Sequence, residues 1–220
     1  MNIPGRLRTA FVLLVLQATF SLNALAADSN SDLREAAKRG DVEAMTRLLA
    51  SGADPNAKDE TGRTALMEAA YWGRADVVKL LLEKSAEVNA KDKQENTALI
   101  LASTTGHAQI IADLLGKGAE VNAKNTEGCT ALIEAASNGR TDAMKALIAK
   151  GADLTLKEKE GRTALILAAN WGHAEAVQAL IEKGADLNAK DKYGYTAMMY
   201  AKREGKAALV DMLKSAGAKQ

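Results

Sequence analysis

Residues 64–70 read T-A-L-M-E-A-A, and the pattern returns as T-A-L-I-L-A-S at 97–103, T-A-L-I-E-A-A at 130–136, T-A-L-I-L-A-A at 163–169 and T-A-M-M-Y-A at 196–201. Each copy begins 33 residues after the one before it. A fixed period of this length is typical of stacked helical units, each too small to bury its own hydrophobic face. The repeat therefore predicts an all-α solenoid, and a solenoid of this kind presents a surface.

The period 59–91 shows why each unit should fold as a turn followed by two helices. Gly62 allows the positive φ that a tight turn requires, and the hydroxyl of Thr64 can cap the first helix. Gly73 is expected to end that helix. A second helix, at roughly 75–84, carries its apolar residues at helical spacing.

The repeat indicates that residues 27–220 form one elongated domain. In the first unit the T-A-L motif is missing and the first helix is more polar. In the last unit Lys202 stands where an alanine would face a further repeat. Because a buried lysine is costly, we expect both end units to be capping repeats. The six units expected are 29–58, 59–91, 92–124, 125–157, 158–190 and 191–220.

Two residues break the glycine pattern of the framework. Ser85 stands where other units have the glycine that ends a helix, and Glu95 stands where they have the glycine of the turn. We predict a positive φ at both residues, which costs about 1 kcal/mol for a residue other than glycine. The alternative interpretation is a functional hinge between residues 85 and 96.

The chain resembles the ankyrin repeat family over residues 29–220. In that family a proline follows the threonine, but each unit here has alanine, which is a strong helix former. The histidine of the family motif is replaced by methionine or isoleucine, which exchanges a hydrogen bond for apolar packing. The residues of the second unit that match the family framework are Asp59, Gly62, Thr64, Ala65, Leu66, Ala69, Ala70, Gly73, Val78, Leu81, Leu82, Ala86 and Asn89.

The resemblance implies a noncatalytic module that binds a partner protein on its concave face. In such domains the partner contacts the turn tips and the residues just after the second alanine of the first helix. Five of the six aromatic residues in 27–220 fall on these positions, and large aromatic side chains often dominate binding energy. The alternative is that Trp72 and Trp171 only cover neighbouring helices. The predicted protein-binding residues are Arg63, Tyr71, Trp72, Thr104, Thr105, Asn138, Arg162, Asn170, Trp171, Tyr193 and Tyr195.

Residues 1–26 are predicted to be a secretory signal peptide. Two arginines precede an apolar run at 10–22, and A-L-A at 24–26 fits a small-residue cleavage site. An uncleaved anchor is the alternative, but a run of 13 residues that includes polar side chains is short for spanning a bilayer. We expect cleavage after Ala26, and the bacterial form of the signal predicts a periplasmic or secreted protein.

The charge balance argues against nucleic acid as a partner. Removing residues 1–26 takes Arg6 and Arg8 from the 29 basic residues and none from the 28 acidic ones, which leaves 27 against 28. No basic stripe of the kind that binds nucleic acid remains. We expect a monomer with a protein partner and no membrane insertion after cleavage.

No residue pattern points to catalysis, so an enzyme is not expected. The sequence lacks a phosphate-binding glycine loop, metal-ligand spacing and a nucleophile paired with a base, and no cofactor is expected. His107 and His173 are two units apart, too far to share a metal, and are predicted to be structural. Cys129, the single cysteine, is expected to be an exposed spectator thiol; the alternative is an intermolecular disulfide.

Two biological settings fit a periplasmic binding module. One is a scaffold or stabiliser of an envelope enzyme, for instance in stress protection. The alternative is an inhibitor or immunity-type protein that blocks a toxin or an enzyme; a host-directed effector is less favoured because the signal predicts ordinary export. A small-ligand binder would need a deep pocket, which a shallow solenoid face does not readily supply.

Overall fold

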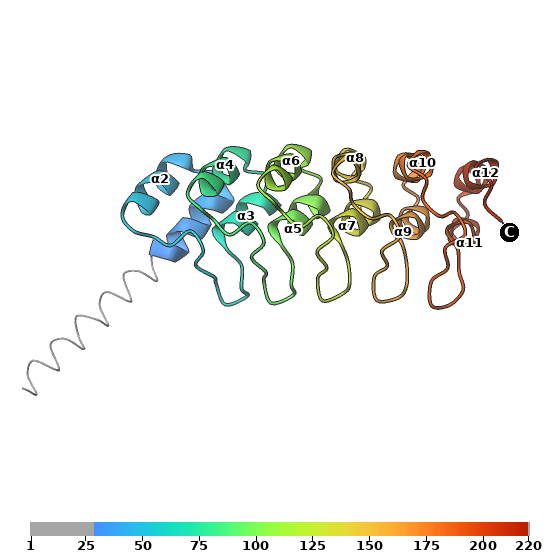
Figure 1. Ribbon diagram of the computed structural model, residues 1–220, viewed down its shortest axis with the longest axis horizontal. Coiled ribbons are helices and arrows are strands. Elements are labelled where there is room, and N and C mark those ends of the chain that lie inside the picture. The colour runs from blue at the N-terminus through green and yellow to red at the C-terminus, as the bar shows by residue number, and fades with distance from the viewer. Residues whose placement is uncertain (1–28, 220) are drawn as a thin grey trace, which may run out of the picture.

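The computed structural model describes residues 29–219, and the predicted signal peptide at 1–26 lies outside them. Within this range the chain forms twelve helices and no strand. The helices follow one another as pairs joined by short connections, and the pairs stack side by side into an elongated array (Figure 1). The prediction of an all-α repeat solenoid of about six units is therefore confirmed.

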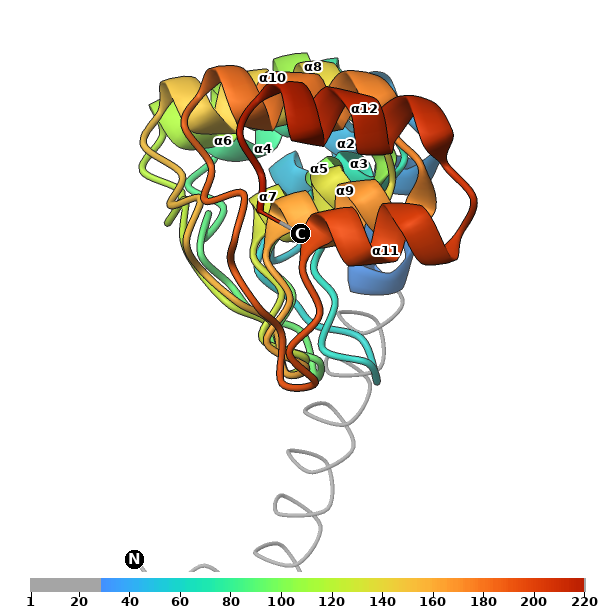
Figure 2. The same ribbon diagram turned by 90° about the vertical axis from the view of Figure 1, so that its right-hand side faces the viewer.

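Each unit contributes its first helix to one layer and its second helix to the other (Figure 2). The opening pair is the helix over residues 29–39 with α2 (Val42–Ala50). The five pairs that follow are α3 (Ala65–Tyr71) with α4 (Ala75–Glu83), α5 (Ala98–Thr105) with α6 (Ala108–Gly116), α7 (Ala131–Ser137) with α8 (Thr141–Ala149), α9 (Ala164–Trp171) with α10 (Ala174–Glu182), and α11 (Ala197–Arg203) with α12 (Ala207–Ser215).

The repeated threonine starts the first helix of every complete unit. Thr64 has extended backbone angles, and its hydroxyl oxygen accepts a hydrogen bond from the Met67 backbone N–H at 3.3 Å. This bond satisfies one of the donors that a helix N-terminus leaves free. The same cap recurs, at 3.3–3.4 Å, on Thr97, Thr130, Thr163 and Thr196.

The core runs along the array as a continuous band. The paired alanines of the first helices, such as Ala69 and Ala70, are fully buried and let neighbouring units approach closely. Larger aliphatic residues of the second helices, such as Ile111 and Leu114 of α6, fill the space between the layers. Each helix packs against its counterpart in the next unit, so the stability of the array depends on neighbour contacts.

The fourth position of the first helix alternates along the array. It is Glu68 in α3 and Glu134 in α7, both half-buried, whereas Leu101 in α5 and Leu167 in α9 are nearly fully buried. The 33-residue repeat therefore carries a second rhythm of two units. This alternation determines whether a glutamate or a leucine lies one helical turn before the exposed residues at the ends of the same helices.

Five loops project from the array on the side of the first helices (Figures 1 and 2), and we call their tips at 59–63, 92–96, 125–129, 158–162 and 191–195 the finger turns. The first residue of each turn is acidic or an asparagine, and its side chain accepts backbone N–H bonds from within the turn. One backbone bond of 2.8–3.0 Å joins each finger turn to the next, as from Lys93 N–H to the Thr61 carbonyl. The fingers thus form one connected row.

A second set of bonds ties each of the four middle units to the unit before it. Arg74 Nε donates to the carbonyl of Lys38 at 2.9 Å, and Arg140 Nε donates to that of Thr104 at 3.3 Å. The rings of His107 and His173 occupy the same position and place Nε2 3.3 Å and 3.0 Å from the carbonyls of Tyr71 and Ser137. The structural role predicted for both histidines is confirmed, and no cluster of metal-ligating side chains occurs in residues 29–219.

The two breaks in the glycine pattern have the predicted backbone geometry. Ser85 has φ 62° and Glu95 has φ 59°, and no other residue of 29–219 except glycine has a positive φ. The repeat geometry is therefore kept at this junction although the residues that normally relieve it are absent. At the C-terminal end, Lys202 of α11 is exposed, as expected of a capping unit.

Length and hydrophobicity also bear on a membrane location. Among the helices of residues 29–219, none combines the length and the apolar character that crossing a bilayer requires. The longest of those after α2 have nine residues.

Candidate protein-binding surface

The finger turns and the neighbouring exposed side of the first helices form one surface, which we call the concave face. Six large hydrophobic side chains are exposed within residues 29–219, and four of them are aromatic residues of this face. Their exposed fractions are 44% for Trp72, 60% for Trp171, 68% for Tyr193 and 41% for Tyr195. The other two are Val42, which opens the outer helix α2, and Met199 of the last unit.

The first aromatic cluster lies at the end of α3 and is held in place. The indole N–H of Trp72 donates to Glu68 Oε2 at 3.1 Å, and the Tyr71 ring meets the Trp72 ring edge to face at 5.3 Å. The Arg63 guanidinium lies 5.5 Å from the Tyr71 ring centre and pairs with Glu68 at 3.2 Å. Lys38 Nζ lies 5.6 Å from the centre of the Trp72 ring. The cluster is therefore preorganised, which lowers the entropy lost on binding.

Trp171 has different surroundings at the end of α9. Its ring makes no hydrogen bond and no ring contact with residues 29–219, and it is more exposed than Trp72. Beside it, Asn170 Oδ1 accepts a bond of 3.3 Å from Arg203 in the next unit. The indole N–H of Trp171 is thus a free donor on an exposed ring.

Two tyrosines extend the surface onto the last finger turn. The Tyr193 hydroxyl donates to Glu160 Oε2 at 2.7 Å, and this bond to a carboxylate raises the pKa of Tyr193. The Tyr195 ring lies 5.6 Å from the ring of Tyr200. Burial and a 2.6 Å bond to Asp191 raise the pKa of Tyr200 to about 12. Tyr200 is thus the one aromatic residue of 29–219 that belongs to the core.

The middle of the surface is polar and largely self-satisfied. The hydroxyls of Thr104 and Thr105 donate back to carbonyls of their own helix at 3.0 Å and 3.2 Å. The Asn138 amide donates to the Glu134 carbonyl at 2.9 Å. Arg162 Nε donates to Glu158 at 3.0 Å, which fixes the guanidinium against its own finger turn. These four predicted residues lie on the surface between the aromatic groups but are already engaged.

The finger turns carry acidic residues that stay ionised. Burial alone would raise the pKa of Glu158, but hydrogen bonds from Arg162 and from two backbone N–H groups hold it below the ordinary value. Burial likewise opposes the bonds from Tyr200 and two backbone N–H groups that lower the pKa of Asp191. Both carboxylates therefore stabilise the turns as anions.

The expectation that Cys129 is exposed is wrong. Cys129 is the last residue of the finger turn at 125–129, and its side chain is half-buried. Burial together with Glu134, Glu158 and Glu127 raises its pKa to about 12. A thiol with this pKa is almost entirely protonated at neutral pH and is a poor nucleophile. The surroundings therefore favour a spectator thiol over an intermolecular disulfide.

Two residues of this surface escaped the sequence reasoning. Glu68 is absent from the predicted protein-binding residues, although its place four residues before Trp72 puts both side chains on one helix face. Arg34, on the more polar first helix of the opening unit, is absent from them as well. The repeat register could have singled out Arg34, because the equivalent residue of the second unit is Met67, which is buried.

Comparisons with known proteins bear on the repeat. A family model that describes three copies of the ankyrin repeat matches residues 33–125, 86–158, 109–191 and 132–220. Together these matches cover the chain from residue 33 to residue 220. A comparison with curated proteins gives no match.

Proposed function

Because the chain belongs to the ankyrin repeat family, whose repeats indicate a protein–protein interaction module, we propose that its concave face binds a partner protein without catalysing a reaction. The protein acts as a monomer in this proposal. A fold alone does not define a function, so the proposal rests on the residues of the surface.

The observation that carries the proposal is the gathering of exposed aromatic residues on one face. Trp72, Trp171, Tyr193 and Tyr195 are exposed there, whereas the core is built almost entirely from alanine and aliphatic residues. Large exposed aromatic side chains are enriched among the residues that dominate the binding energy of protein interfaces. The core of the solenoid therefore does not account for the exposure of these four side chains.

The surface is also suited to binding without rearrangement. The finger turns are joined to one another by backbone hydrogen bonds, and Trp72 is held by Glu68 and Tyr71. A preformed surface loses less conformational entropy when a partner docks. The two tryptophans act as anchors at either end, and the polar residues between them provide complementarity.

We place this binding in the bacterial periplasm, on the strength of the signal-like residues 1–26. There the protein serves as a scaffold or stabiliser of an envelope enzyme, possible roles including stress protection. An inhibitor or immunity-type protein that blocks a toxin or an enzyme is the second candidate, because it would use the same rigid face. A host-directed effector is a lesser one.

The test is affinity capture of partners from an envelope fraction, with Trp72→Ala/Trp171→Ala as the altered form. Truncation of such anchors typically costs about 2 kcal/mol or more each, so the double variant should bind its partner about 1,000-fold more weakly. Val42→Ala is the matched control, because Val42 is an exposed hydrophobic residue on the outer helix α2. Equal recovery with the double variant would refute binding on the concave face.

The captured partner then separates the two settings. A stabiliser should preserve the activity of its partner through heat or oxidation when the two are equimolar. An inhibitor should abolish that activity at the same ratio. The assay needs only the partner and the wild-type protein.

A further inference from the structure

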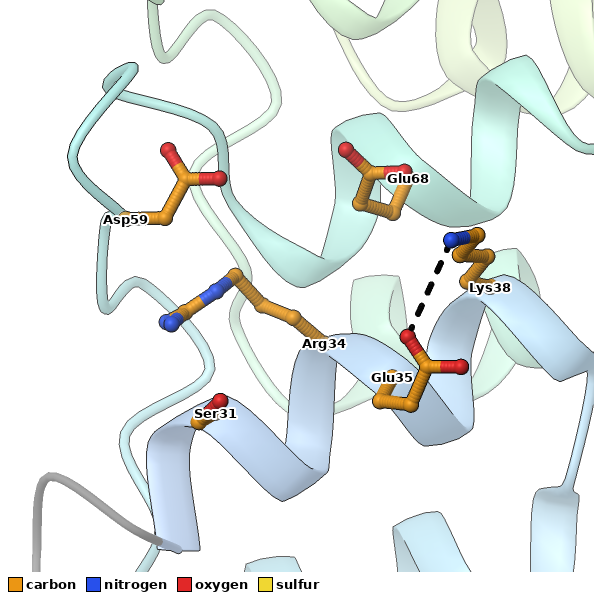
Figure 3. A pocket seen from close by; sticks show the side chains of 6 residues that line it. All are labelled: Ser31, Arg34, Glu35, Lys38, Asp59 and Glu68. Atoms are coloured by element: carbon orange, nitrogen blue, oxygen red, sulfur yellow. Dashed lines mark ion pairs between the residues drawn. The ribbon is translucent and has the colours of Figure 1, made fainter.

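A pocket of about 320 Å³ lies at the N-terminal end of the concave face. It opens between the helix over residues 29–39, the first finger turn and α3 (Figure 3). Its lining is polar throughout and brings together charges of both signs. The residues that line it are Ser31, Arg34, Glu35, Lys38, Asp59 and Glu68.

One oxygen of the Asp59 carboxylate in this pocket is already satisfied. Its Oδ1 accepts hydrogen bonds from the Thr61 N–H at 2.8 Å, the Thr61 hydroxyl at 2.7 Å and the Arg63 N–H at 2.9 Å. These bonds belong to the finger turn, and equivalent ones recur in the other turns. Asp59 Oδ1 is therefore committed to holding its own loop. Burial raises the pKa of this carboxylate, whereas these bonds and the Arg34 charge, which acts from beyond ion-pair distance, bring it below the ordinary value.

The other two carboxylates also have partners. Glu35 lies 3.9 Å from Lys38 and 3.6 Å from Arg39 on its own helix. Glu68 pairs with Arg63 at 3.2 Å and accepts the indole N–H of Trp72. Glu35 and Glu68 are thus each paired with a basic side chain.

Arg34 is the exception. Its Nη1 is buried and has no hydrogen-bond partner among residues 29–219, and no carboxylate of that range lies within ion-pair distance of the guanidinium. Figure 3 shows the guanidinium in the pocket, between Ser31 on one side and Asp59 on the other. A buried donor of a charged group that is left unpaired is costly, so a ligand that accepts from it is favoured.

We propose that this pocket binds a carboxylate group, with the Arg34 guanidinium as the main donor and the Ser31 hydroxyl as the second. The placement rests on the proposed function, because the carboxylate would belong to the protein docked on the concave face. Lys38 and Glu68 line the pocket and also contact Trp72, so one partner can reach both.

The charges select a carboxylate over a phosphate. Of the charged residues that line the pocket, Arg34 and Lys38 are basic and Glu35, Asp59 and Glu68 are acidic, so the lining has no surplus positive charge to balance a dianion. A carboxylate carries one negative charge and matches the planar fork of arginine. A phosphate dianion would bring a second charge close to three carboxylates.

The test is an NMR titration that follows the guanidinium signals of Arg34 and the backbone amide signals of the pocket residues Ser31 and Glu35, the amides being the readout for variants that lack Arg34. N-acetylglutamate α-amide offers a side-chain carboxylate, N-acetylglycine offers a chain-terminal one, and N-acetylglutamine α-amide is the neutral control. We expect millimolar binding of a carboxylate probe, and the probe that binds more tightly identifies its source in the partner. Equal shifts with the neutral amide, no shift with either carboxylate, or tighter binding of inorganic phosphate would overturn the proposal.

The matched variant is Arg34→Met, because methionine is the buried residue in register in the second unit, at Met67. It should weaken carboxylate binding by about tenfold or more. Arg47→Met, which removes an exposed arginine of the outer helix α2, should leave binding unchanged. Binding by Arg34→Met within twofold of the wild type contradicts the assignment.

A second substitution guards against a folding defect in Arg34→Met. Arg34→Lys keeps the charge but removes the planar fork, so it should bind the carboxylate probe several-fold more weakly. Unchanged affinity in Arg34→Lys would mean that the pocket recognises charge alone, and the assignment of the guanidinium fork fails.

The titration is independent of partner capture. Loss of capture in Trp72→Ala/Trp171→Ala without carboxylate binding at Arg34 would keep the proposed function and remove the pocket from it. If Arg34 binds the carboxylate probe but partner capture is the same with and without both tryptophans, the pocket proposal stands and binding on the concave face is refuted.

Discussion

Trp72 and Trp171 occupy the same position in their units, three units apart, but their surroundings differ. Four residues earlier on its helix, Trp72 has Glu68, which accepts the indole N–H, whereas Trp171 has the apolar Leu167. The first ring is consequently held and less exposed, and the second is free. The alternation at the fourth helix position thus decides whether an anchor of the concave face is fixed before binding.

The backbone also differs between the first half of the array, up to α6, and the second half, residues 118–219. The first half keeps Ser85 and Glu95 at positive φ, whereas the second half has glycine at every such position of 118–219. Repeat geometry is therefore imposed by the neighbouring units and not by the residue that happens to stand at a turn. The predictions that follow test this reading of the two halves, from the largest expected effect to the smallest.

Transferring the glutamate of the first half to the second should be the most costly change. Gly161 has φ 79°, and a Cβ there would lie 3.0 Å from the backbone nitrogen of Lys192. Gly161→Glu should lower the free energy of unfolding by about 2 kcal/mol in urea denaturation. A loss below about 0.5 kcal/mol would show that positive φ carries little strain in this fold.

Truncating the two tryptophans should separate the held ring from the free one. Trp72→Ala removes the bond to Glu68 and the contact with Tyr71, so it should lower the free energy of unfolding by about 1.5 kcal/mol. Trp171→Ala should change it by no more than about 0.5 kcal/mol. Equal losses in thermal and urea unfolding would mean that both rings are structural, and the argument that Trp171 is reserved for a partner would fail.

Restoring glycine in the first half should stabilise the protein. Ser85→Gly and Glu95→Gly should each raise the free energy of unfolding by about 1 kcal/mol, because glycine adopts positive φ without steric cost. Ser85→Ala is the control, since alanine keeps the Cβ that causes the strain. If neither glycine variant raises the free energy of unfolding, the positive φ angles carry no strain, and the alternative of a hinge between residues 85 and 96 is favoured.

The smallest effect is a pH dependence at the first finger turn. Burial would raise the pKa of Asp59, but the bonds from the Thr61 hydroxyl and the Arg63 and Thr61 N–H groups lower it below 3.8. A lowered pKa stabilises the folded protein above pH 3.8, and this contribution disappears as the pH falls through the folded value. Asp59→Asn should thus lower stability at pH 7 by about 0.5 kcal/mol or less, and the difference should vanish once the pH falls below the pKa of Asp59 in the folded protein.

The second half supplies the control for that experiment. Asn125 occupies the same position and accepts the same two backbone bonds at 2.9–3.0 Å, so a neutral amide fits the turn. Asn125→Asp should introduce a pH dependence of the same sign at the third complete unit. Stability that varies equally with pH in Asp59→Asn and the wild type would exclude the carboxylate as the cause.

The sequence predicted those parts of the structure that the backbone determines. A strict 33-residue period gives each residue the same backbone setting as its counterparts, which is why Ser85 and Glu95 could be assigned positive φ from the glycines elsewhere. The threonine caps were predictable because a helix N-terminus needs an acceptor and threonine recurs at that point.

The details of the candidate surface depended on side chains that neighbouring units bring together. The pairing of Glu68 with Trp72 required a choice of rotamer, and the unpaired state of Arg34 depended on which groups Asp59 and Glu68 had already bound. Cys129 was misjudged because its turn position indicated exposure, whereas burial, with Glu134 of α7 and Glu158 of the next finger turn beside it, depends on how the elements pack. The binding role of the predicted surface residues stays a prediction.

The alternation of glutamate and leucine sets the increment by which such an array can change length. Deleting one 33-residue unit would place Glu68 beside Glu134, or Leu101 beside Leu167, and would repeat one kind of support along the face. Deleting or duplicating two adjacent units keeps different residues at the fourth helix position of neighbouring units. The true building block of this surface is a pair of repeats, and an engineer who extends it should add units two at a time.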